Sequence, residues 1–152
     1  MLKEGTVAAT LEGYDQHGNM FRLAEERGRW VVLYFYPKDE TLGCTAEACA
    51  FRDAMESLET SRAEVVGVST QSQESHRTFS EHHRLGFRLI ADPDKRIAKA
   101  YDALGFLGLA QRVTYLIDPE GQIRDAYRSE MSPTSHVDHV RSRLREFQGP
   151  AA

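Results

Sequence analysis

Residues 30–49 read Trp-Val-Val-Leu-Tyr-Phe-Tyr-Pro-Lys-Asp-Glu-Thr-Leu-Gly-Cys-Thr-Ala-Glu-Ala-Cys. The first seven form an unbroken apolar and aromatic run, which is typical of a strand buried on both faces of a sheet. Pro37 ends the run, and apolar side chains then recur at helical spacing between residues 43 and 59. The stretch therefore predicts a buried strand, a short loop and an amphipathic helix.

The chain on either side alternates between strand and helix patterns. Further strands are expected at residues 64–69, 87–91, 113–117 and 123–127, and further helices at 73–84, 92–101 and 135–147. Turn residues 15–19 predict a hairpin between strands at 6–11 and 20–23, and Asp118-Pro119-Glu120-Gly121 predicts another. This order predicts an α/β protein with a thioredoxin-like fold, in which a mixed central β-sheet carries helices on both faces.

Length and composition bound the organisation and the partners. The 152 residues are enough for one domain, expected at 1–148, with a flexible tail at 149–152. The net charge of −4, without a basic cluster, argues against a nucleic-acid partner. No apolar run approaches the ~20 residues of a membrane span, and the opening Met-Leu-Lys-Glu-Gly lacks the apolar stretch of a secretory signal. We therefore expect a cytoplasmic protein.

The chemistry centres on Cys44, one of two cysteines in the chain. It falls in the first turn of the expected helix, where free N–H groups and the helix dipole favour an anion and can lower a thiol pKa from its ordinary ~8.5. Gly43 lets a ligand approach the backbone closely. The hydroxyl of Thr41 can cap the helix or bond a substrate oxygen. The pattern indicates a nucleophilic thiolate at the edge of the sheet.

Cys49 lies five residues after Cys44. On an ideal helix this spacing separates the two Cα atoms by roughly 8.5 Å, whereas a disulfide spans at most about 7 Å. If the two cysteines pair, the first turn or two of the helix must unwind. The alternative is that Cys44 and Cys49 are simply small buried apolar residues without redox chemistry. Zinc is disfavoured because it needs four ligands and no histidine is close in sequence, so neither a metal nor a cofactor is expected.

The segment resembles the active-site signature of the peroxiredoxins, Pro-x-x-x-Thr-x-x-Cys, which Pro37, Thr41 and Cys44 satisfy. The following Thr45-x-Glu47-x-x-Cys49 resembles the bacterioferritin-comigratory-protein or Q-type subfamily, an atypical two-cysteine group with its second cysteine on the same helix. The similarity covers nearly the whole chain through further motifs: Gly67-Val68-Ser69, Ser75-His76-x-x-Phe79, Ala91-Asp92-Pro93-Asp94 and Leu116-Ile117-Asp118-Pro119-Glu120-Gly121.

The resemblance implies a thiol-dependent peroxidase that reduces hydrogen peroxide and organic hydroperoxides. Cys44 would attack the O–O bond and become a sulfenic acid. Cys49 would then condense with it, and a thioredoxin or similar dithiol would reduce the resulting disulfide. Because both cysteines lie in one chain, the resemblance also implies a monomer.

Four further residues take roles from the resemblance. Thr41 would hydrogen-bond the peroxide and the thiolate, and Pro37 would shield the pocket from water. Arg112 would stabilise the thiolate and the developing charge, and Glu47 would orient Arg112. By themselves Arg112 can be an ordinary strand-end arginine and Glu47 a first-turn acid that favours the helix dipole.

Some residues depart from the family pattern or stand outside it. Leu42 replaces the usual proline, which predicts a less preorganised loop and easier unwinding around Cys44. Gln71 and Gly86 also differ from many relatives. The run Phe106-Leu107-Gly108-Leu109 forms either an apolar rim of the pocket or ordinary packing under a loop. The histidines of the expected helices, His82, His83, His136 and His139, are expected on solvated faces.

Two other functions stay open at this point. A general thiol–disulfide oxidoreductase on the same fold normally carries C-x-x-C, whereas this chain has C-x4-C. A redox-switched binding protein or holdase would use the same disulfide to melt the helix and expose Phe51 and Met55.

Overall fold

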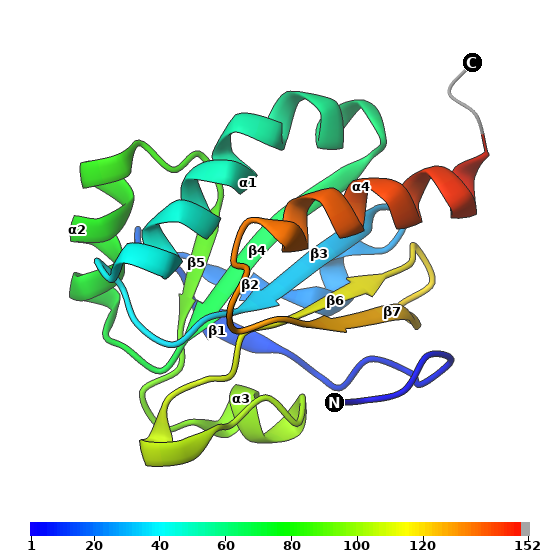
Figure 1. Cartoon of the computed structure of the whole chain (residues 1–152). Helices are drawn as coiled ribbons and strands as arrows, with labels where there is room; N and C mark the ends of the chain where they lie inside the picture. The colour runs from blue at the N-terminus through cyan, green and yellow to red at the C-terminus, as the bar shows by residue number, and fades with distance from the viewer. Residues whose placement is uncertain (150–152) are drawn as a thin grey trace.

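The computed structural model describes residues 1–149 as a sheet with helices on both faces (Figure 1). The strands are β1 (Glu12–Tyr14), β2 (Met20–Arg22), β3 (Trp30–Phe35), β4 (Ala63–Ser69), β5 (Arg88–Ala91), β6 (Val113–Ile117) and β7 (Ile123–Arg128). The helices are α1 (Leu42–Thr60), α2 (Gln73–His83), α3 (Arg96–Ala100) and α4 (Ser135–Gln148), with short 3-10 turns η1 (Leu23–Glu26) and η2 (Phe106–Gly108). The predicted α/β class is confirmed.

The central sheet has the strand order β5-β4-β3-β6-β7. β3, β4 and β5 run parallel, whereas β6 is antiparallel to both β3 and β7. All six residues of β3 are buried, as its unbroken apolar run predicts. The sheet is therefore mixed, and its central strand is covered on both faces.

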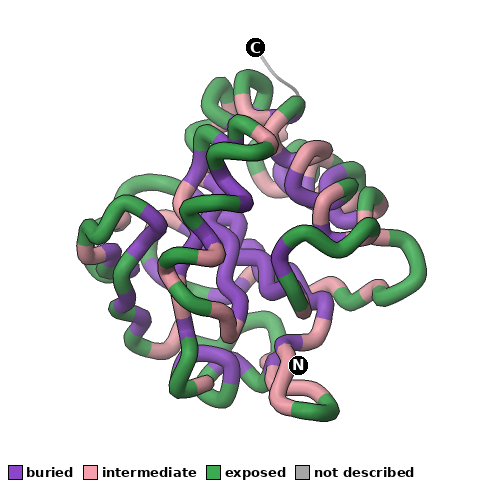
Figure 2. Tube along the Cα trace, turned by 90° about the vertical axis from the view of Figure 1, so that its left-hand side faces the viewer, coloured by how far each residue is buried: buried purple, intermediate pink, exposed green. Residues whose placement is uncertain are grey.

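Alternate residues of β3 enter two separate cores. Val32 and Tyr34 face a core that α1, α2 and α4 cover, whereas Leu33 and Phe35 face a second core that contains α3 and the β1–β2 hairpin. This is the period-two alternation of a strand. In Figure 2 the buried segments run through the middle of the molecule and the exposed ones along its outer loops.

The carboxyl ends of β3, β4 and β5 meet the amino end of β6 at one edge of the sheet. The register pairs Phe35 with Val68 on one side and with Val113 on the other. The loop after β3 therefore starts beside the residue that precedes β6, which is Arg112. The helix α1 begins at the end of that loop, so the fold directs Arg112 toward the start of α1.

The expected first strand at residues 6–11 is wrong. β1 instead occupies Glu12–Tyr14, and Val7 forms an isolated bridge with Gln122, so the earlier segment pairs beside β7. The reason is the tight turn, in which the Asp15 carboxylate accepts hydrogen bonds from the N–H groups two and four residues ahead. This turn pairs Tyr14 directly with Met20 and so fixes the strands next to it.

The helix expected from residue 92 begins four residues later. Residues 92–95 form a turn closed by a hydrogen bond from Lys95 N–H to Asp92 O (3.0 Å). The Asp92 carboxylate then accepts from the N–H groups of Ile97 and Ala98 at 3.0 and 2.8 Å, and so caps α3 from outside. The other predicted elements agree with the structure to within one or two residues.

The expected tail at 149–152 lies outside the described residues except for Gly149. Its N–H donates to Arg145 O at 2.9 Å and closes the last turn of α4. Within residues 1–149, every helix is too short or too polar to cross a membrane.

Leu42 is the first residue of α1, and its side chain is 91% exposed. Thr41 before it has extended backbone angles (φ −83°, ψ 155°), which is the conformation that a following proline requires. We predict that Leu42→Pro stabilises the protein by about 0.4–1 kcal/mol, because it restricts the unfolded chain without a clash. It should also increase hydrogen-exchange protection around Cys44, and unchanged protection there would contradict the prediction.

Candidate active site

Cys44 is the third residue of α1, and its side chain is only 1% exposed. The preceding Thr41 is the N-cap residue, but its side chain does not cap the helix. Its Oγ1 donates instead to Lys38 O at 2.8 Å, while its backbone carbonyl accepts from Thr45 N–H at 2.9 Å. The hydroxyl thus stabilises the loop, and the first N–H groups of α1 have no side-chain acceptor from Thr41.

Arg112 is the charged group in contact with the sulfur. Its Nη2 donates to Cys44 Sγ at 3.4 Å, and its Nη1 donates to Glu47 Oε1 at 2.7 Å. Its backbone N–H donates to Glu130 Oε1 at 3.0 Å. The guanidinium is 6% exposed, so its charge acts on the sulfur with little screening by water. The contact places a fixed positive charge beside the sulfur.

Gly43 permits this contact. A Cβ built at Gly43 would lie 3.3 Å from Arg112 Nη2 and 3.3 Å from Pro133 Cγ, which is tighter than most side-chain contacts. The absent side chain therefore admits the guanidinium and the loop before α4. The space beside Gly43, which was expected to admit a ligand, is therefore occupied by Arg112.

Glu47 is fully buried one helical turn after Cys44. Burial raises its pKa to about 8, although the charge and the hydrogen bond of Arg112 act in the opposite direction. Its Oε2 has no hydrogen-bond partner within residues 1–149, which agrees with a strong desolvation effect. Near neutral pH the pair therefore favours a protonated Glu47, and the positive charge of Arg112 remains available to Cys44.

His136 packs behind Glu47 and is fully buried. Its Nε2 donates to Ser129 O at 3.0 Å, so Nδ1 is the unprotonated nitrogen and accepts from Thr114 Oγ1 at 2.8 Å. Burial lowers the pKa of His136 to about 4, and Arg112 acts in the same direction. The approach of His136 Nδ1 to Glu47 Oε2 (3.7 Å) is therefore not an ion pair at neutral pH.

A second buried network holds the loop between β3 and α1. The Asp39 carboxylate accepts from Tyr36 OH at 2.6 Å and from Ser75 Oγ at 2.8 Å, and it lies 2.6 Å from His76 Nδ1. Because His76 Nε2 donates to Ile90 O (3.1 Å), both of its ring nitrogens face acceptors. Burial acts to raise the pKa of Asp39, but His76, Tyr36 and Ser75 outweigh it and lower the pKa. The geometry thus describes a buried, hydrogen-bonded pair of Asp39 and His76 that joins the loop to α2.

Comparison with known proteins agrees with this site. Residues 5–126 match the AhpC/TSA family. Peroxiredoxin Bcp of Bacillus subtilis is 39% identical over 151 residues, which cover 94% of this chain and 95% of that protein. Chloroplastic peroxiredoxin Q of Sedum lineare is 38% identical over 136 residues, which cover 88% of this chain and 73% of that protein.

This chain belongs to the AhpC/TSA family. Its Bcp and peroxiredoxin Q relatives assign it to the subfamily that the sequence motifs suggest. Membership of this family makes the chain a peroxiredoxin, that is, a thiol-dependent peroxidase.

Solved structures support the same assignment. The peroxidoxin BcpB of Mycobacterium tuberculosis superposes with a TM-score of 0.89 at 35% identity, over 96% of this chain and 98% of that one. The bacterioferritin comigratory protein of Xanthomonas campestris, described for its alkyl peroxide reduction activity, gives 0.84 at 32% identity, over 90% of this chain and 91% of that one. These neighbours confirm the thioredoxin-like fold of this peroxiredoxin.

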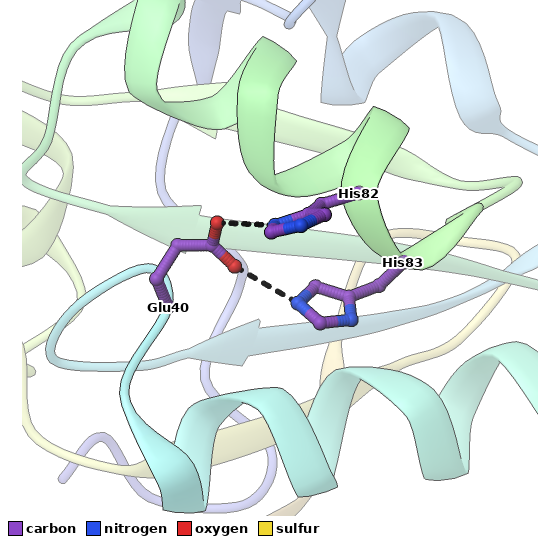
Figure 3. Close-up of side chains that lie close together, drawn as sticks. All are labelled: Glu40, His82 and His83. Atoms are coloured by element: carbon purple, nitrogen blue, oxygen red, sulfur yellow. Dashed lines mark hydrogen bonds and ion pairs between the residues drawn. The ribbon is translucent and has the colours of Figure 1, made fainter.

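The expected positions of the histidines are partly wrong. His136 is buried, and His139 is half-buried with its Nε2 2.6 Å from Asp125 Oδ2. His82 is exposed as expected, but both His82 and His83 contact a carboxylate of the loop before α1 (Figure 3). Helical periodicity placed His136 and His139 on a solvated face, but a polar helix can bury a histidine that finds hydrogen-bond partners.

The two cysteines of the peroxiredoxin lie in one continuous helix as free thiols. Cys44 is buried, whereas Cys49 is half-buried. The prediction that they share an intact helix is confirmed, and the geometric bar to a disulfide in this conformation follows from it.

The run at 106–109 is an exposed loop. Phe106 is 95% exposed and Leu107 91%, and Thr70 Oγ1 donates to Gly108 O at 3.2 Å. These two side chains therefore do not pack under the loop. A surface cavity of about 390 Å³ is lined by Met55, Phe87 and other residues near the far end of α1, and its lining includes neither cysteine.

Sequence reasoning missed the groups behind the site. His136 and Thr114 support the buried side of Glu47, and Asp39 with His76 holds the loop. The signal for the second pair was present in the Ser75-His76-x-x-Phe79 motif, which matched the subfamily without an assigned role. Thr114 and His136 are 22 residues apart in the chain, and Asp39 and His76 are 37 residues apart. No local sequence pattern therefore joins either pair.

The raised pKa of Glu47 predicts a pH dependence of stability. Since the folded pKa of about 8 exceeds the ordinary value of 4.5, the folded state binds the extra proton between these values. The contribution of Glu47 to the free energy of unfolding is therefore complete below pH 4.5 and is lost as the pH rises to about 8, on the order of a few kcal/mol. Denaturant unfolding across this range measures it.

Glu47→Gln should remove this slope, because glutamine resembles the protonated acid and does not titrate. Both proteins are compared in a Cys44→Ser background, so that ionisation of the thiol does not contribute. Parallel pH profiles for the two proteins would show that Glu47 is ionised throughout.

Proposed function

We propose that this peroxiredoxin reduces hydrogen peroxide and organic hydroperoxides with Cys44 as the attacking thiolate and Cys49 as the resolving thiol. The observation that carries the proposal is the 3.4 Å hydrogen bond from Arg112 Nη2 to Cys44 Sγ at the start of α1. It combines a fixed positive charge with the positive end of a helix dipole at one sulfur. We also propose that residues 1–148 act as one domain, as a monomer and in the cytoplasm.

In the first step the Cys44 thiolate attacks one peroxide oxygen. The S–O bond forms as the O–O bond breaks, and the leaving oxygen departs as water or an alcohol after it takes up a proton. Sulfur is oxidised to a sulfenic acid and the peroxide is reduced. Arg112 stabilises first the thiolate and then the negative charge on the leaving oxygen. Its Nε is buried and has no hydrogen-bond partner within residues 1–149.

The neighbouring residues set the geometry of this step. Glu47 holds the guanidinium through the 2.7 Å hydrogen bond to Nη1 and thereby orients Nη2 toward the sulfur. The Thr41 oxygen can still accept a hydrogen bond from the peroxide while its proton is held by Lys38 O. Pro37, half-buried at the end of β3, limits access of water.

In the second step the Cys49 thiol attacks the Cys44 sulfenic acid. The S–S bond forms as the S–OH bond breaks, and water is released. Because α1 is continuous through both cysteines, its first turns must unwind before the sulfurs meet. A thioredoxin-type dithiol then reduces the disulfide by exchange and completes the cycle.

Single-turnover experiments test the two cysteine roles. The reduced protein should consume one peroxide and form one disulfide per chain. Cys49→Ser should also consume one peroxide but accumulate the sulfenic acid, whereas Cys44→Ser should consume none. Peroxide, sulfenic acid and disulfide are measured in parallel by quenched flow and mass spectrometry.

The same experiment separates the other two functions. A general disulfide oxidoreductase would exchange with protein disulfides and ignore peroxide. A redox-switched holdase would react with peroxide slowly in every variant. Either result would overturn the proposed peroxidase mechanism.

Arg112 is tested by graded substitution. Arg112→Met removes the charge, and we expect sulfenic acid formation to slow by roughly 100-fold or more. Arg112→Lys keeps the charge but loses the planar fork that contacts Glu47 and Cys44 together, so its rate should lie between the two. Arg96→Lys, at an exposed side chain of α3, is the matched control. An unchanged rate in Arg112→Met would remove the basis of the proposed function.

A further inference from the structure

Glu40, His82 and His83 converge at the loop between β3 and α1, called the catalytic loop below (Figure 3). Glu40 lies in the loop next to the N-cap Thr41, and the two histidines are the last residues of α2. His82 Nδ1 lies 2.7 Å from Glu40 Oε2, and His83 Nε2 lies 2.8 Å from Glu40 Oε1. One carboxylate thus faces two imidazole nitrogens.

The three donor atoms suit a divalent transition metal. They lie within 4.8 Å of one another, so small side-chain rotations place them around one ion. Two imidazole nitrogens and one carboxylate oxygen, with water as the fourth ligand, form a tetrahedral donor set of the kind that zinc takes in open sites. Zinc is favoured among the candidates because it imposes little geometry of its own on such a surface site.

The local structure holds the donors in place. Glu40 has a left-handed backbone (φ 62°), which is unfavourable for a non-glycine residue and therefore needs a compensating interaction. The His83 ring packs edge-on against the buried Phe79, with ring centroids 5.2 Å apart.

We propose that Glu40, His82 and His83 bind one Zn²⁺ ion that links the catalytic loop to the end of α2. The ligand atoms are His82 Nδ1, His83 Nε2 and the carboxylate of Glu40. The sequence spacing does not disclose this site, because Glu40 precedes the two histidines by 42 and 43 residues.

The site bears on resolution, and this consequence rests on the proposed function. Glu40 is four residues before Cys44, and the Cys44–Cys49 disulfide forms only after the start of α1 unwinds. A metal that joins Glu40 to α2 stabilises the wound conformation. Bound Zn²⁺ therefore slows disulfide formation and prolongs the life of the sulfenic acid, while the attack of Cys44 on peroxide is unchanged.

Binding is tested first without the cysteines, which would themselves bind zinc. The untagged full chain with Cys44→Ser and Cys49→Ser is titrated with Zn²⁺ by calorimetry. One ion per chain is expected, with at least tenfold weaker binding in His82→Gln and in Glu40→Gln. His17→Gln, at an exposed histidine in the β1–β2 turn, is the matched control and should bind as the parent does. Equal binding by all variants would overturn the proposed metal site. The contacts of Glu40 with His82 and His83 would then be hydrogen bonds without a role in metal binding.

The effect on resolution is tested with both cysteines present. Zn²⁺ should slow disulfide formation at least tenfold in the parent chain and have no such effect in the His82→Gln/His83→Gln variant. Equal slowing in both proteins would mean that zinc acts on the thiols and would overturn the proposed control of resolution. If the metal-free chain consumes no peroxide, the proposed function fails, whereas the calorimetric result on the cysteine-free chain stands independently.

Discussion

The contact between Arg112 and Cys44 is the interaction on which the site depends. A buried guanidinium needs hydrogen-bond partners, and here Glu47 and the sulfur both accept from it. Burial shifts Glu47 toward its protonated form, so Glu47 offsets little of the positive charge that Arg112 places beside the sulfur. The proposed attack of Cys44 on peroxide depends on this positive charge.

This contact needs support from behind and beside it. Thr114 and neutral His136 fill the space behind Glu47 with satisfied hydrogen bonds, so no second charge competes for Arg112. The backbone of Arg112 is held by Glu130 beyond β7. The guanidinium therefore has a fixed position relative to the start of α1, which is the preorganisation that electrostatic stabilisation requires.

In the proposed cycle the loop before α1 has the opposite requirement, because it holds Cys44 in place and later releases it. The buried pair of Asp39 and His76 holds the loop near β3, and Glu40 holds it to the end of α2 through exposed contacts. Exposed ion pairs are weak, whereas breaking a buried pair is costly. We therefore infer that the loop opens from the Glu40 side toward Thr41 and Leu42, while Asp39 stays in place.

The sequence by itself determined the local features: a buried strand, a loop, and a helix with one cysteine in its first turn and the other five residues later. These follow from periodicity and from the rise per residue, which need no knowledge of the rest of the chain. Arg112 and Glu47 were predictable only through resemblance to a family. Residues 6–11 were misassigned because their true partner lies beside β7.

Only the tertiary structure decided which distant groups meet at the sulfur. Arg112 is 68 residues from Cys44 in the chain, and it arrives there because the pairing of Phe35 with Val113 sets β6 beside β3 in one register. The partners of Asp39, Glu40 and Glu47 are likewise brought close by the packing of α2 and β6 against β3 and α1. Contacts of this kind depend on strand register and helix packing, which no local pattern of residues encodes.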